Sequence, residues 1–201
     1  LEYGKLLVGK TILSSKGYGM FVDFYLSGNV IMNIGDGVSA RYYNPGDKVP
    51  ANYQLLLTFK DESFLVFTVA MYGFISAYPD GVIDNKYYTI SRESISPLSD
   101  AYTEAEFEKL FASAKKTLTA KALLATEQRI PGVGNGVTQD ILFNAGIHPK
   151  QKVFDLSDGQ KGVLFKSLKD TLMAMTSGRG RDTQTDLYGN EGGYKTILSS
   201  K

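Results

Sequence analysis

The pattern of apolar residues changes near residue 100, and this change constrains the fold more than any other feature of the sequence. Residues 5–78 hold short β-branched or aromatic runs separated by turn formers, which is typical of an antiparallel sheet. Residues 103–178 instead repeat apolar residues at the helical period. Strands followed by helices predict an α+β protein. We expect a partial antiparallel β-sandwich in residues 1–95 and a helical domain in residues 96–178.

Local signals predict the individual elements. Four runs pair as two hairpins around short turns of Ser-Gly-Asn and Lys-Asp-Glu: residues 21–26 with 30–34, and 53–59 with 64–69. Capping-box spacings and apolar periodicity predict four helices: residues 103–116, 120–126, 136–145 and 158–177. Residues 78–100 are rich in Pro, Gly, Asn and Ser and predict a linker, and the glycine-rich residues 179–201 predict a mobile loop.

Charge is distributed unevenly along the chain. Residues 1–114 hold 9 Lys+Arg against 13 Asp+Glu, a net −4, whereas residues 115–201 hold 13 against 8, a net +5. Nucleic-acid binding requires clustered basic residues, so any such surface is expected in the second half.

Composition excludes several classes of protein. Without Cys and with a single His, these residues can form neither a disulfide nor a thiolate metal site, so we expect no cofactor within the chain. No apolar run approaches the roughly 20 residues that cross a bilayer, and no secretion signal is evident. We therefore expect a cytoplasmic protein that is not secreted and has no membrane partner. Both ends lack natural start and stop features, so a longer parent protein is expected.

Residues 129–149 carry the strongest functional signal, a glycine-rich turn followed by a helix that ends in Gly-Ile-His-Pro. Gly132 and Gly134 allow the backbone to approach another surface closely. The N–H groups that open the helix can bind a phosphate, and Asn135, expected at the cap, can add its side-chain amide. A tight connection between two helices, without any ligand, explains the same residues and is favoured by their chemistry alone.

The whole segment resembles the helix-two-turn-helix of formamidopyrimidine-DNA glycosylases and endonuclease VIII. In that family a Pro-Gly or Val-Gly, any residue and Gly-Asn precede a helix that ends in Ala-Gly-Ile-His-Pro. Residues 96–99, Ser-Pro-Leu-Ser, resemble the family's interdomain linker, and the two hairpins resemble the latter part of its β-sandwich. The resemblance implies base-excision repair by a monomer that binds double-stranded damaged DNA between its domains. It also implies that Lys121 approaches the DNA backbone near the lesion.

The resemblance implies further contacts in the C-terminal loop. Arg181 is expected to bind DNA, although a solvated loop charge explains it equally. Arg179, Tyr194 and Lys195 lie where the family's loop faces the extruded base.

The resemblance also implies a wedge, which is a side chain that fills the gap in the duplex when the damaged base is extruded. The family fills the gap left by the base with a Met, an Arg and a Phe, and the corresponding residues here are Asp36, Ala70 and Tyr72. Only Tyr72 can replace lost stacking, and it fits a packed strand residue equally well.

The family's catalytic start has no counterpart in this sequence. Its nucleophile is an N-terminal proline amine followed by an acid/base glutamate, and Glu2 does not match that glutamate. Met20 replaces a lysine that many members carry. The resemblance therefore places the glycosylase and abasic-site lyase chemistry in the parent protein and implies an inactive fragment. It also places zinc in a four-cysteine ribbon beyond residue 201. His148 is expected to cap a helix rather than to catalyse.

Two alternatives remain open. A non-catalytic DNA-binding relative fits the departures at Met20, Asp36 and Ala70. An RNA- or ribosome-associated helix-two-turn-helix protein fits the helical segment, but it does not explain the β-rich half.

Overall fold

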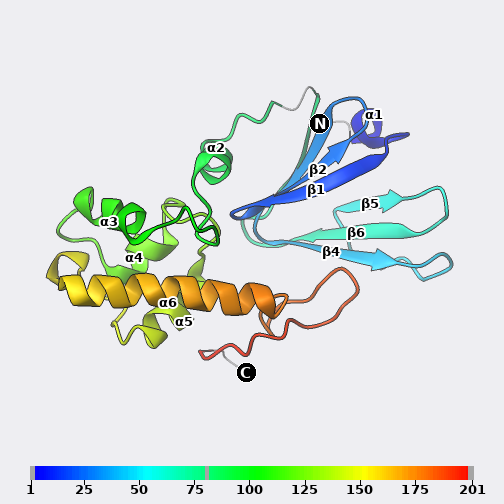
Figure 1. Ribbon diagram of the computed structural model, residues 1–201. Coiled ribbons are helices and arrows are strands. Elements are labelled where there is room, and N and C mark those ends of the chain that lie inside the picture. The colour runs from blue at the N-terminus through cyan, green and yellow to red at the C-terminus, as the bar shows by residue number, and fades with distance from the viewer. Residues whose placement is uncertain (1–2, 80–81, 199–201) are drawn as a thin grey trace.

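The computed structural model describes residues 3–79 and 82–198, which form a β-sandwich joined to a helical domain (Figure 1). This confirms the predicted α+β class. A four-stranded sheet has the order β1-β2-β3-β7, and a three-stranded sheet has the order β4-β6-β5. All pairings are antiparallel. The strands are β1 (Ile12–Tyr18), β2 (Phe21–Leu26), β3 (Val30–Ile34), β4 (Val38–Tyr43), β5 (Leu55–Thr58), β6 (Phe64–Val69) and β7 (Ile75–Tyr78).

Both predicted hairpins are present, as β2–β3 and β5–β6. The side chains that alternate to the inner faces of the two sheets form the core, with Met32 and Phe67 almost fully buried. The start of the chain differs from the expected sheet pattern, because α1 (Tyr3–Leu7) is a short helix.

The predicted linker at residues 78–100 contains a helix, α2 (Lys86–Glu93), so that prediction is wrong in part. Asn85 caps the helix by accepting hydrogen bonds from the N–H groups of Tyr87 and Tyr88. Tyr88 is buried and donates a 2.6 Å hydrogen bond to Asp23, a carboxylate without solvent exposure on the outer face of the four-stranded sheet. This tertiary contact stabilises a helix that local composition does not predict.

The helical domain contains α3 (Glu104–Ala112), α4 (Ala120–Ala125), α5 (Asn135–Asn144), the short 3₁₀ helix η2 (Val153–Asp155) and α6 (Asp158–Ser177). The capping box of Ser157 and Gln160 is confirmed at the start of α6. The first helix ends four residues earlier than predicted, because Ala114 N–H bonds to the carbonyl of Phe111 and begins a turn. One core, with Phe107, Leu164 and Leu168 fully buried, joins the helices. Among the described helices, none combines the length and hydrophobicity of a membrane span.

Candidate nucleic-acid interface

The turn before α5 leaves the start of this helix open. Gly134 is the N-cap, with extended backbone and no side-chain cap, so the prediction that Asn135 caps the helix is wrong. Asn135 is instead the first helical residue, and its side chain is exposed. A Cβ on Gly134 would meet no atom within 4 Å. The space beside Gly134 is therefore open, and the N–H groups of the first turn, which have no partner within the helix, are the groups that can bind an anion there.

Arg181 lies over this same helix start. A Cβ on Gly136, the second residue of α5, would lie 3.0 Å from the Arg181 guanidinium carbon and 3.1 Å from Nη2. The glycine therefore makes room for the guanidinium. Arg181 Nε donates to Gln184 Oε1 at 3.4 Å within the C-terminal loop. The structure thus brings Gly134, Asn135 and Arg181 together, and the guanidinium adds positive charge where the helix dipole is already positive.

Gly132 makes its close approach to the other domain. A Cβ on Gly132, whose φ is +84°, would lie 3.2 Å from the carbonyl oxygen of Gly19 in the β1–β2 turn. Gly19 also has positive φ, and a Cβ there would lie 3.0 Å from Pro131 Cβ. The surface that Gly132 was expected to approach is therefore the β-sandwich, and the two glycines fix the contact between the domains. Met20 follows Gly19 in this turn and is half-buried.

Lys121 lies in the first turn of α4 and is exposed. It lines a cavity of about 460 Å³ together with Thr138 and Gln139, in the second turn of α5. Lys121 thus lies beside the second turn of α5. His148 lines the same cavity, but it does not cap the helix as predicted: its Nδ1 accepts a 3.2 Å hydrogen bond from the N–H of Lys150.

The last carbonyls of α5 are bonded instead by Gly146 N–H and Ile147 N–H, which donate to Phe143 and Leu142. A backbone motif thus supplies the cap that was predicted for the histidine.

Tyr72 is 92% exposed and Met71 is 93% exposed, in the turn that follows β6. The interpretation of Tyr72 as a packed strand residue is therefore wrong. Ala70 N–H donates to the carbonyl of Gly37 at 2.8 Å, and this brings the turn against the one that carries Asp36. The two turns that carry Asp36 and residues 70–72 therefore lie side by side, and the role of Tyr72 as a wedge stays a prediction. The sequence analysis does not single out Met71 as an exposed apolar residue. Its position beside an aromatic residue in a turn was a signal that could have indicated this exposure.

Backbone hydrogen bonds join the two ends of the C-terminal loop. Gly193 N–H donates to the carbonyl of Gly178 at 2.7 Å, and Tyr194 N–H donates to that of Gly180 at 3.0 Å. Farther along, Asp182 accepts hydrogen bonds from the N–H and hydroxyl groups of Thr196. A glycine-rich composition predicts mobility, whereas these backbone contacts tie the two ends of the loop together.

The three residues expected to face the extruded nucleobase lie where the two ends of the loop meet. Arg179 and Lys195 are exposed, and Lys195 lies 3.9 Å from Asp182. Tyr194 is half-buried against α5, where desolvation and the neighbouring carboxylate of Asp140 raise the pKa of its phenol. Asp140 is fully buried and also accepts from the N–H groups of residues 197 and 198. It thereby anchors the end of the loop on α5.

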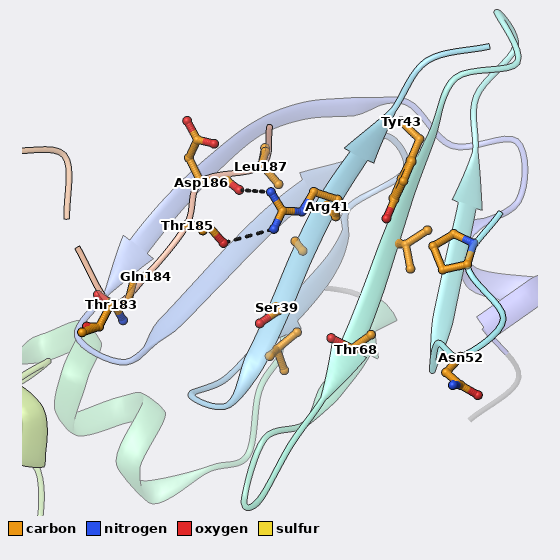
Figure 2. A pocket seen from close by; sticks show the side chains of 14 residues that line it. Ser39, Arg41, Tyr43, Asn52, Thr68, Thr183, Gln184, Thr185, Asp186 and Leu187 are labelled. Atoms are coloured by element: carbon orange, nitrogen blue, oxygen red, sulfur yellow. Dashed lines mark hydrogen bonds between the residues drawn. The ribbon is translucent and has the colours of Figure 1, made fainter. Parts of the chain in front are cut away.

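A cavity of about 580 Å³ lies beside the middle of this loop, on the outer face of the three-stranded sheet (Figure 2). Its walls come from β4, β6, residues 50–52 and residues 183–187 rather than from Arg179, Tyr194 or Lys195. The sequence analysis missed this cavity, because its lining residues lie on segments that are more than 100 positions apart.

Within residues 3–79 and 82–198, no group of three or more His, Asp or Glu side chains is arranged to hold a metal ion, and the chain has no Cys. These residues therefore do not fit a zinc site. Glu2 lies outside the described residues.

Comparisons with known proteins give a consistent result, although no family model matches the chain. The chain is 26% identical over 190 residues to a formamidopyrimidine-DNA glycosylase of Brevibacillus brevis and 27% identical over 188 residues to that of Shouchella clausii. These alignments cover 93% and 92% of the chain and 67% of each relative, so the chain spans about two thirds of their length.

Solved structures share the fold. The MutM (Fpg) protein of Thermus thermophilus matches with a TM-score of 0.74 and 24% identity, over 96% of this chain and 71% of that one. A Lactococcus lactis Fpg in complex with DNA that contains an abasic site matches with a TM-score of 0.74 and 20% identity, over 91% and 67%.

Proposed function

Because the chain is similar to formamidopyrimidine-DNA glycosylases over more than nine tenths of its length, we propose that it belongs to that family and is the damaged-DNA-binding part of a base-excision repair enzyme. The observation that carries the proposal is the open start of α5, where Gly134, Asn135 and the guanidinium of Arg181 meet. Backbone N–H groups and a guanidinium at a helix N-terminus bind phosphate without reading the base sequence. A repair protein needs this sequence-independent binding of phosphate, because lesions occur in any sequence.

The remaining contacts fit a double-stranded DNA that lies between the domains. Lys121 shares the α5 surface and is free to reach a neighbouring phosphate. Tyr72 stands exposed at the end of β6 that points towards the helical domain, as Figure 1 shows for the strand. An aromatic ring there can fill the gap that an extruded base leaves.

The chemistry is proposed for the full-length gene product. There an N-terminal proline amine displaces the damaged base, forms a Schiff base with the sugar and permits strand cleavage by elimination. Zinc is proposed in a ribbon beyond residue 201, and this chain alone is proposed to be inactive. The full-length protein is proposed to act as a monomer in the bacterial cytoplasm, associated with the nucleoid.

A non-catalytic DNA-binding relative is the second candidate. Met20, beside the domain contact, replaces a lysine of many members, and Asp36 and Ala70 replace two of the family's gap-filling residues. These departures leave the phosphate grip intact, so they are compatible with binding that is not followed by chemistry.

Borohydride trapping distinguishes the two candidates. The full-length protein is incubated with duplexes that contain an abasic site or an oxidised base, and borohydride reduces any Schiff base to a stable adduct. The enzyme proposal predicts a covalent adduct on the full-length protein and none on residues 1–201. Tight, salt-sensitive binding without an adduct on the full-length protein would establish the non-catalytic binder instead.

A further inference from the structure

Helix α2, which lies between the two domains, is held against the four-stranded sheet by a buried carboxylate (Figure 1). Asp23 has no solvent exposure, and its Oδ2 accepts a 2.6 Å hydrogen bond from the hydroxyl of Tyr88. Its Oδ1 accepts a second one, also of 2.6 Å, from the side-chain amide of Asn33 on the neighbouring strand. A buried charge that lacks donors is strongly unfavourable, so Asp23 favours the position of α2 in which Tyr88 reaches it.

Tyr88 also packs against both sides of the β1–β2 turn. Its ring meets Tyr18, at the end of β1, and Phe21, at the start of β2, edge to face at centroid distances of 6.3 and 5.6 Å. Tyr18 and Phe21 are partners in the antiparallel register and enclose the turn residues 19–20. The guanidinium of Arg92 donates to the Tyr88 hydroxyl at 3.1 Å and lies over the ring of Tyr18. Helix α2 therefore fixes the position of this turn.

The β1–β2 turn in its place touches both α2 and the helical domain. A Cβ on Gly19 would lie 2.9 Å from Oγ of Ser91, in the last turn of α2. It would also lie 3.0 Å from Cβ of Pro131 and 3.1 Å from the backbone nitrogen of Gly132. These four residues form a junction of three segments, and Gly132 lies two residues before Gly134, the N-cap of α5. The junction therefore connects the position of α2 to the helix start that is proposed to bind phosphate.

A further contact between the domains lies on the three-stranded sheet. The N–H of Tyr42 on β4 donates to the carbonyl of Leu187, in the C-terminal loop, at 2.8 Å. The junction lies instead at the four-stranded sheet. If the junction loosens, the helical domain can turn about the contact that remains.

We propose that Asp23 and Tyr88 are positioning residues, which hold the two domains at the separation that DNA requires. The inference rests on the proposed function and adds to it the residues that set the width of the DNA-binding cleft. A cleft that is fixed before binding loses less conformational entropy when DNA enters. Removal of the Tyr88 hydroxyl leaves the ring in place, but it takes one of two short hydrogen bonds from Asp23 and frees α2 to move.

The test compares Tyr88→Phe with Tyr87→Phe, the same change at the preceding residue of α2. Tyr87 is 49% exposed, so water can solvate its hydroxyl, and the change there should have no effect. Because the chain has no cysteine, spin labels can be attached specifically at Lys60→Cys in the β5–β6 turn and at Glu108→Cys on α3, which are both exposed. Electron–electron distance measurements without DNA should give a broader distribution for Tyr88→Phe and the wild-type distribution for Tyr87→Phe.

DNA binding supplies a readout that general damage to the fold would not give. An abasic duplex should restore the wild-type distance distribution in Tyr88→Phe, because the bound DNA itself holds the domains. Its affinity should fall by about 3- to 10-fold, the effect of one or two hydrogen bonds. The slope of log K against log salt should not change, because the variant removes no phosphate contact.

A wild-type distribution for Tyr88→Phe without DNA, or a broad one that DNA does not narrow, would overturn the inference and leave the proposed function standing. A changed distribution in Tyr87→Phe would overturn it as well, since the effect would then not depend on Asp23. Failure of the proposed function is recognised separately, because the wild-type chain would then bind neither abasic nor intact DNA. That result would also refute a role of the junction in DNA binding.

Discussion

Replacing Gly136 with alanine should stabilise the protein and weaken its binding to DNA. Gly136 is the second residue of α5, and alanine within a helix is more favourable than glycine by about 0.5–1 kcal/mol. The new Cβ would lie 3.0 Å from the guanidinium carbon of Arg181, and it would overlap with Nη1. The guanidinium must therefore leave the start of the helix.

The expected loss in binding follows from the phosphate contact that we propose for Arg181. A hydrogen bond to a charged group contributes about 1.5–3 kcal/mol, and part of it is recovered if the flexible side chain finds another position. A net loss of about 1–2 kcal/mol corresponds to roughly 5- to 30-fold weaker binding. Losing one phosphate contact should also reduce the slope of log K against log salt by about 0.9.

Gly159→Ala is the matched control, because Gly159 is likewise the second residue of a helix, α6, and its nearest neighbour to a new Cβ is Ser157 Oγ at 4.0 Å. Urea unfolding should show a similar gain in stability for both variants. Fluorescence anisotropy over a salt series should show weaker binding for Gly136→Ala alone. The reasoning about Arg181 is refuted if both variants bind DNA like the wild type, with the same salt slope.

Lys121→Ala and Asn135→Ala should each weaken binding to duplexes of any sequence by about 1–3 kcal/mol in anisotropy titrations, and unchanged affinity in two folded variants would exclude the phosphate grip. Tyr72→Ala should weaken binding to an abasic duplex more than to an intact one, because its ring replaces stacking only at a gap; equal effects would exclude a wedge. Burial and the hydrogen bond to Asp23 raise the pKa of Tyr88 to about 12, so the stability that this phenol contributes is present below pH 10 and is lost as the pH rises towards 12. Urea unfolding across this range should show a smaller loss in Tyr88→Phe, and an identical loss would contradict this account.

Local signals in the sequence were sufficient for most of the fold. The Ser-Gly-Asn and Lys-Asp-Glu turns mark the two hairpins, and the Ser157–Gln160 capping box marks the start of α6. Helix α2 was missed, because Tyr88 is stabilised by Asp23, which lies 65 positions earlier. A long-range contact of this kind leaves no trace in local composition.

The sequence predicted those residues of the candidate site that lie close together along the chain. Gly134, Asn135 and Lys121 lie in or near one motif; the structure places Gly134 and Asn135 at the start of α5 and Lys121 beside the second turn of that helix. The role of Gly132 required the structure, since its neighbour Gly19 belongs to the other domain. The cavity beside Arg41 could not be predicted either, because it combines a strand face with a loop more than 140 positions away.

Affinities for intact and damaged DNA show whether this chain binds damaged DNA through a phosphate-binding surface. Anisotropy titrations would use an intact duplex and the same duplex with one tetrahydrofuran abasic analogue, each at several salt concentrations. We expect tighter binding to the abasic duplex and a linear fall of log K with log salt for both duplexes. Equal affinity for the two duplexes, or binding that does not depend on salt, would contradict this expectation.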